Sequence, residues 1–223
     1  TGVQTCSLPI WWAGTRAPRP SAREMAGAVA ERVFEAGWGL VSGGARGIDQ
    51  IPRQVMAGGP SAKSGSPRGR ASGRLLSVLP EGLGNGALGS SARLGAPSVG
   101  ETFLSAAAPA ACFSTAQAMA RNALIYAAGP ATIVFQPRYR TGGTWHGAVA
   151  ALRQRWGRVW LWAGEAAHAD PEESLAISAL TALGAEPFGC IEELLSWLAT
   201  PAEALEWTGP GFWGVPSALG RSA

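Results

Sequence analysis

The chain has 223 residues, 47% of them hydrophobic, so it is long enough to bury one ordinary core and we expect one domain or a little more. Its formal net charge of +3 is carried almost entirely by arginine, because Lys63 is the sole lysine. This composition excludes disorder throughout. No apolar run approaches the roughly 18 residues that would span a bilayer, and no signal peptide is recognisable, so we expect a cytoplasmic protein without a membrane segment.

Apolar runs that stop at glycine or at loop residues predict the strands of a sheet. We expect strands at 10–13, 39–42, 75–79, 101–105, 131–136 and 158–162, and a further short strand at 185–188. Helical periodicity predicts helices between them, at 21–36, 50–57, 115–128, 145–156, 171–183 and 191–199. The mainly apolar run at 131–136 is typical of a strand in a parallel sheet that is covered on both faces.

Two of these helices begin at a sequence pattern that resembles a capping box. Ser21 with Glu24 opens the first helix, which Gly37 ends, and Ser114 with Gln117 opens the helix at 115–128. In the helix at 50–57, Pro52 must lie in the first turn, where its missing N–H costs little. The pattern therefore predicts alternating strands and helices, which is an α/β fold.

The cysteines and histidines do not predict a metal site. Cys6, Cys112 and Cys190 are widely spaced and lie near neither histidine in the sequence. Neither a disulfide framework nor a zinc site follows from this spacing. We expect no metal and no cofactor.

The two ends of the chain are set apart from the expected domain at 11–200. Residues 1–10 are similar to the translated read-through of a common sequencing adapter, and we exclude them from fold reasoning. The chain would then be a metagenomic fragment whose native start is missing; the alternative is an ordinary N-terminal extension. Residues 201–223 are rich in Trp, Gly and Pro and are expected to form a tail, and residues 60–73 a basic surface loop.

The turn at residues 42–49 carries the clearest chemical signal. Its sequence, Ser-Gly-Gly-Ala-Arg-Gly-Ile-Asp, follows an apolar strand and precedes a helix. Glycines let backbone N–H groups approach a ligand, and a helix N-terminus favours an anion. Arg46 can bind a phosphate through two hydrogen bonds. The turn lacks both the dinucleotide-binding and the P-loop glycine patterns. The alternative is a plain strand-to-helix turn with a solvated arginine.

The same residues resemble the S-G-x-A-R-G-I-D signature of the DNA-processing protein DprA/Smf family, part of the Rossmann-like SLOG superfamily. Residues 14–18, Gly-Thr-Arg-Ala-Pro, are similar to the family's G-[ST]-R-x-P, and residues 121–125 are similar to its R-N-R-I-I helix. The resemblance covers about residues 10–163. It implies a Rossmann-like three-layer fold with a mainly parallel sheet flanked by helices.

The sequence also departs from the family pattern. No histidine follows residue 49 in the next helix, and Ala106 stands where the family has an acidic residue. Residues 84–100 offer glycine, serine and Arg93 in place of the family's Tyr-Pro segment with a basic residue that helps to hold DNA. That contact is therefore not transferred to this chain.

Candidate binding residues gather in the loops after the first, second and fifth strands, and in the helix at 115–128. Since ligands bind at the carboxyl ends of parallel strands, these loops are expected to meet at one edge. Asn122 has the alternative of a helix-surface residue, while Tyr139 and Trp145 either stack on bases or pack in the core. The candidate residues for phosphate or single-stranded DNA are Gly14, Thr15, Arg16, Ser42, Gly43, Gly44, Arg46, Gly47, Asp49, Arg121, Asn122, Arg138, Arg140, Thr141, Gly142, Gly143 and Thr144.

The resemblance implies a dimeric protein without catalytic residues. Such a protein would bind and protect incoming single-stranded DNA and help to load RecA during transformation or recombination. The alternative is a nucleotide-binding SLOG protein, either a sensor or an enzyme like the LOG phosphoribohydrolases. Residues 141–146 are distantly similar to the LOG loop, but its catalytic glutamate is missing, and His146 is more typical of a capping or surface residue.

Overall fold

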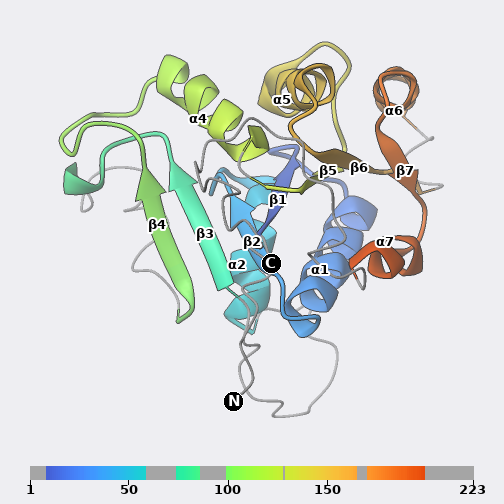
Figure 1. Ribbon diagram of the computed structural model, residues 1–223, viewed down its shortest axis with the longest axis horizontal. Coiled ribbons are helices and arrows are strands. Elements are labelled where there is room, and N and C mark those ends of the chain that lie inside the picture. The colour runs from blue at the N-terminus through green and yellow to red at the C-terminus, as the bar shows by residue number, and fades with distance from the viewer. Residues whose placement is uncertain (1–8, 59–73, 86–98, 128, 165–169, 199–223) are drawn as a thin grey trace, which may run out of the picture.

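The computed structural model describes residues 9–58, 74–85, 99–127, 129–164 and 170–198. Its centre is one sheet of seven strands in the order β4-β3-β2-β1-β5-β6-β7, and every neighbouring pair is parallel (Figure 1). The strands are β1 (Ile10–Gly14), β2 (Gly39–Ser42), β3 (Arg74–Leu79), β4 (Glu101–Ser105), β5 (Ala131–Phe135), β6 (Arg158–Trp162) and β7 (Glu186–Phe188).

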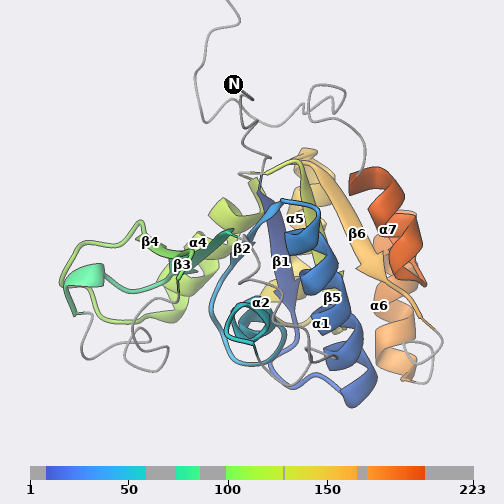
Figure 2. The same ribbon diagram turned by 90° about the horizontal axis from the view of Figure 1, so that it is seen from below.

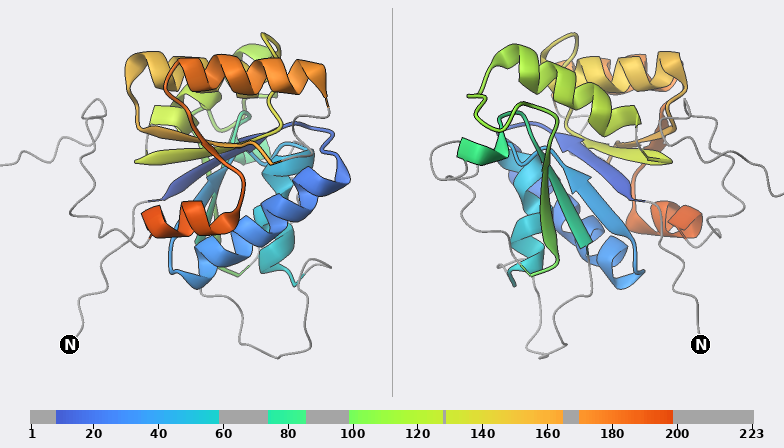
Figure 3. Two further views of the ribbon diagram at one scale, coloured as in Figure 1. Left: turned by 90° about the vertical axis from the view of Figure 1, so that its right-hand side faces the viewer. Right: turned by 60° about the vertical axis from the view of Figure 1, so that its left-hand side comes forward.

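Helices cover both faces of this sheet (Figures 2 and 3). One face carries α1 (Pro20–Glu35), α2 (Ile51–Met56) and α7 (Ile191–Leu198), and the other carries α4 (Thr115–Ala127), α5 (Gly142–Gln154) and α6 (Pro171–Ala182). Short 3-10 turns lie at η1 (Gly47–Gln50) and η2 (Leu83–Asn85). The expected Rossmann-like three-layer architecture is confirmed, with a sheet that is parallel throughout its described strands.

Successive side chains of a strand point to opposite faces of the sheet, and in the central strands both sets are buried under helices. In β6, Trp160 and Trp162 pack on the side of α1 and α7, whereas Leu161 packs on the side of α5 and α6. Trp12 in β1 packs against Phe135 in β5, and the centroids of the two rings are 4.9 Å apart. These bulky residues hold the central strands, and therefore the loops that follow them, in fixed positions.

The order in which the chain adds strands to the sheet reverses at β1. The chain proceeds from β1 through β2 and β3 to β4 on one side, and then crosses to β5 on the other side of β1. This reversal is the topological switch point, where open parallel sheets bind their ligands. The loops after β1 and β5 diverge there.

One predicted capping box is wrong and the other is partly right. The first helix begins at Pro20 after Arg19, and Ser21 Oγ accepts a hydrogen bond from Arg19 Nε instead of capping the helix. Pro20 presets the backbone angle of the first helical position, so the helix starts before Ser21. At α4, the Gln117 N–H donates to Ser114 Oγ at 3.1 Å, as a capping serine requires.

Other boundaries differ by a few residues. The helix predicted from Trp145 begins at Gly142, so Gly142 and Gly143 both lie in its first turn. The predicted basic loop at 60–73, the tail at 201–223 and residues 1–8 lie outside the described residues, as does Cys6. The expected domain boundaries remain predictions.

The described ranges contain neither a membrane-spanning helix nor a cluster of metal ligands. None of their helices is both long enough and apolar enough to pass through a bilayer. Within the same ranges, no group of three or more His, Cys, Asp or Glu side chains is arranged to hold a metal ion. Cys112 and Cys190 are exposed and free.

Candidate nucleic-acid interface

The loops after β1 and β2 and the start of α5 after β5 are tied together at the carboxyl edge of the sheet. The Ile48 N–H donates to the Thr15 carbonyl oxygen at 3.1 Å, which joins the turn after β2 to the loop after β1. Thr144 Oγ1 donates to the Gly14 carbonyl oxygen at 3.0 Å, which joins the start of α5 to the same loop. The structure therefore brings the candidate segments together.

The turn after β2 is held in one conformation by its own side chains and by Gly47. Ser42 Oγ donates to the Asp49 carbonyl oxygen at 2.6 Å and accepts from the Gly44 N–H at 3.2 Å. Gly47 has a φ of +86°, and a Cβ there would overlap the Thr15 carbonyl oxygen. A residue with a side chain would therefore push the two loops apart.

Arg121 reaches this turn from α4. It is 9% exposed, and its Nη1 occupies the space that a Cβ on Gly43 would need, beside Asp49 Oδ2. The next residue, Asn122, points about 100° away around the helix, and its Nδ2 lies against Gly143 instead. Both residues therefore lie at the strand ends, but they contact different segments.

The carboxylate of Asp49 lies in a crowded environment. Loss of solvation raises its pKa to about 6, although nearby Arg121 and hydrogen bonds from the backbone N–H groups of Ala45 and Gly14 act in the opposite direction. Asp49 therefore takes up its proton near pH 6, well above the usual range of an aspartate, and its backbone hydrogen bonds join it to the ends of β1 and β2. The sequence placed Asp49 among the candidate binding residues and gave no sign of these contacts.

Arg121 is shared between two carboxylates. Burial lowers its pKa, and the negative charges of Asp49 and Glu81 favour the charged form. Its Nε has no hydrogen-bond partner among the described residues. Its charge is thus directed into the turn, where it supports Gly43, and it is not presented on the surface.

The exposed positive charges of this edge come from the loops. Arg16, Arg46, Arg138 and Arg140 are all exposed, and they follow β1, β2 and β5. Arg46 forms no ion pair with any residue in the described ranges. An exposed and unpaired guanidinium can bind phosphate without first giving up a partner.

The two aromatic candidates differ in exposure. Trp145 is 8% exposed and lies edge-on to Tyr139, with 5.1 Å between the ring centroids. Packing is therefore the role that its contacts support. Tyr139 is partly exposed, and the guanidinium of Arg140 lies 5.1 Å from the centre of its ring.

The N-terminus of α5 offers backbone donors to this edge. Thr141, its N-cap residue, makes no side-chain capping bond, and Thr141 and Gly142 are exposed. Unpaired N–H groups at a helix N-terminus favour an anion. His146 is exposed, and its Nδ1 lies 2.9 Å from the Gly142 carbonyl oxygen, so it lies at the helix start.

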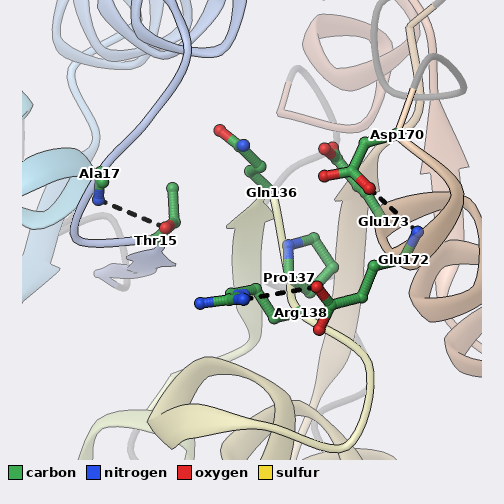
Figure 4. Close-up of a pocket in the computed structure, with 8 residues that line it drawn as sticks. All are labelled: Thr15, Ala17, Gln136, Pro137, Arg138, Asp170, Glu172 and Glu173. Carbon is green, nitrogen blue, oxygen red and sulfur yellow. Dashed lines mark hydrogen bonds and ion pairs between the residues drawn. The ribbon is translucent and has the colours of Figure 1, made fainter.

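A pocket of about 220 Å³ opens beside this edge, at the switch point (Figure 4). It lies between the loops after β1 and β5 and the beginning of α6, and three of its side chains are acidic. Its lining consists of Thr15, Ala17, Gln136, Pro137, Arg138, Asp170, Glu172 and Glu173.

The acidic residues of this pocket are not among the candidates that the sequence predicted. Asp170 accepts the Glu172 N–H at 2.9 Å as the N-cap of α6, a role that an aspartate before Pro171 could have suggested. Glu173 is 2% exposed and pairs through both carboxylate oxygens with Arg19. Neither Glu173 nor the Arg19 guanidinium is therefore available for a ligand. Nothing in the sequence indicated that α6 would approach the loops after β1 and β5.

The family model for DNA recombination-mediator protein A matches residues 10–199. The chain belongs to this family. The match extends through α6, β7 and α7, beyond the part of the chain that the sequence motifs covered. A search among curated proteins gave no match.

Solved structures share the fold at low identity. DNA processing protein A (DprA) from Streptococcus pneumoniae superposes with a TM-score of 0.64 at 19% identity, over 85% of this chain and 61% of that one. DNA processing protein A from Helicobacter pylori, whose structure concerns its single-stranded DNA binding mode, gives 0.61 at 19% identity, over 86% and 80%. A molybdenum cofactor binding protein from Rippkaea orientalis gives 0.58 at 15% identity, over 87% and 97%. The chain thus spans about three fifths of the length of the S. pneumoniae protein.

Proposed function

We propose that this chain binds single-stranded DNA through its phosphates, along the carboxyl edge of the sheet. The observation that carries the proposal is the convergence of exposed arginines from three loops with the open N-terminus of α5, in a chain of this family. Phosphate contacts of this kind position a strand without reading its sequence.

The proposed role is binding without catalysis. The chain would protect incoming strands and help to load RecA as a cytoplasmic homodimer, as the family resemblance implies. His146 hydrogen-bonds to the backbone at the helix start, and Asp49 braces the turn beside Arg121. These contacts support structural roles for both groups.

Fluorescence anisotropy of a labelled dT oligonucleotide and of its duplex, at two salt concentrations and with AMP as competitor, tests the proposal. We expect the single strand to bind more tightly than the duplex, to weaken as salt rises, and to resist displacement by AMP. Capture of AMP without binding of DNA would overturn the proposal in favour of a nucleotide enzyme or sensor.

A further inference from the structure

The carboxylate of Asp49 acts as an internal anion at the turn after β2. It accepts hydrogen bonds from the backbone N–H groups of Ala45 in this turn and of Gly14 at the end of β1, and its Oδ2 lies beside Gly43. Asp49 keeps part of its surface exposed, so it lies next to solvent. Backbone N–H groups in such turns are typical donors to anions. The carboxylate thus uses donors that would otherwise be available to a phosphate.

The charges around Asp49 balance one another. Arg121 of α4 and Arg16 of the loop after β1 both attract its carboxylate, and Glu81 of the turn after β3 attracts Arg121. Tyr126 of α4 lies near Asp49 and stays neutral, because burial raises its pKa. Two positive and two negative charges therefore cancel while Asp49 is ionised. When Asp49 is protonated, one positive charge remains in excess, and this charge favours a phosphate at the edge.

The helices on the other side of η1 contribute little to this balance. They contact it through the apolar core around Ile48 and Ile51. Arg53 of α2 pairs with Glu101 of β4, with 2.9 Å between Nε and Oε2. The charged residues of α1 between Pro20 and Glu35 are the exposed Arg23, Glu24, Arg32 and Glu35 and the half-buried Glu31.

Arg16 connects the exposed edge to the carboxylate of Asp49. Its side chain is exposed, and its positive charge acts on Asp49. A phosphate bound to Arg16 would cancel this charge and place a negative charge near the carboxylate, and both effects favour the protonated form. We propose that Asp49 tunes the affinity of this edge for single-stranded DNA: binding draws a proton from solvent onto its carboxylate, so affinity rises as pH falls. This inference rests on the proposed function.

The environment of Asp49 brings this linkage into an accessible pH range. Loss of solvation raises the pKa of Asp49 to about 6 in the free chain, and a bound phosphate raises it further. A rise of about one pH unit in the complex makes the affinity increase roughly tenfold between about pH 8 and about pH 5. An aspartate with an ordinary pKa would stay ionised over most of this range. The phosphates and thymines of a dT oligonucleotide do not titrate in it.

Anisotropy with a labelled dT oligonucleotide, from about pH 8 to about pH 5 at constant ionic strength, tests the proposal. We expect the natural chain to bind roughly tenfold more tightly at the acidic end. Asp49→Asn is uncharged throughout, so it should bind more tightly than the natural chain at the alkaline end and lose most of the pH dependence. A purely structural role for Asp49 predicts weaker binding of this variant at every pH, and that result would overturn the proposal.

The matched control is His146→Gln, because histidine also changes charge in this pH range and His146 is exposed at the start of α5. This variant should keep the dependence that Asp49 causes. A dependence that disappears in His146→Gln and persists in Asp49→Asn would assign the proton to the histidine and contradict the proposal.

A second measurement does not require a variant of Asp49 to fold. Calorimetric titration of the natural chain and of His146→Gln with the same oligonucleotide, in two buffers of different ionisation enthalpy, counts the protons taken up on binding. Near pH 6.5 we expect uptake of about half a proton per chain bound. Binding without proton uptake overturns the linkage and leaves the proposed function standing, whereas absence of binding at every pH rejects the proposed function and this inference with it.

Discussion

The guanidinium of Arg121 fills the space that a side chain on Gly43 would occupy. Arg121 of α4 can therefore pack against the turn after β2 only because residue 43 is a glycine, and Asp49 lies beside both residues. This contact sets the position of the turn from which Arg46 projects.

Gly43→Ala should therefore disturb the turn. The added methyl group would displace Arg121 from Asp49, so we expect the free energy of unfolding to fall by about 1–3 kcal/mol and binding of single-stranded DNA to weaken. Urea denaturation and anisotropy measure the two effects. The control is Gly189→Ala, where a Cβ meets nothing within 4 Å, and a change within about 0.5 kcal/mol is expected. Equal stability of the two variants would contradict the contact.

Asp49 should make stability depend on pH. Its pKa of about 6 in the folded chain lies above the value of about 3.9 in an unfolded chain, so the folded state binds this proton more tightly. The contribution of Asp49 to stability therefore increases as pH falls from about 6 towards 4, by at most about 1.4 kcal/mol per pH unit. Asp49→Asn lacks this titration.

The measurement is the difference in the free energy of unfolding between the natural chain and Asp49→Asn, by urea denaturation over this pH range. We expect the difference to shift in favour of the natural chain at lower pH. A shift in the opposite direction would mean that the electrostatic attraction of Arg121 outweighs the loss of solvation.

The ion pair of Arg19 with Glu173 should matter more than the exposed pair of Arg158 with Glu186. Glu173 is 2% exposed, whereas both partners of the second pair are well exposed. Glu173→Gln leaves a largely buried guanidinium without its counter-charge, and we expect a loss of about 3 kcal/mol in the free energy of unfolding. Glu186→Gln, measured in the same way, should cost less than about 1 kcal/mol. Similar losses would show that the burial of Glu173 has no energetic consequence.

Much of this fold could be predicted from local sequence patterns. Apolar runs such as 131–135 and 158–162 are short and rich in β-branched or aromatic residues, which favours buried strands, and strands that alternate with helices form a parallel sheet whose loops share an edge. Arg46 and Arg138 could therefore be assigned to one edge without a structure. The error at Ser21 arose because Pro20 sets the helix start by its fixed backbone angle, which a capping pattern does not consider.

The contacts that shape the site could not be predicted in this way. The approach of Arg121 to Gly43 depends on how α4 packs on the sheet, and the acidic side of the pocket depends on where α6 begins. Gln136 has a φ of +49°, a conformation that its residue type does not suggest. These features follow from tertiary packing between segments far apart in the sequence.

The comparison of Arg46→Ala with Arg153→Ala tests the central claim most directly. Both arginines are exposed, but Arg46 lies in the turn after β2, while Arg153 lies in the last turn of α5, towards the opposite edge of the sheet. By anisotropy with a dT oligonucleotide over a series of salt concentrations, Arg46→Ala should weaken binding about tenfold and reduce the slope of log K against log salt by about 0.7. Arg153→Ala should leave both values nearly unchanged. Equal losses in the two variants would contradict a phosphate site at this edge and indicate diffuse attraction of charge.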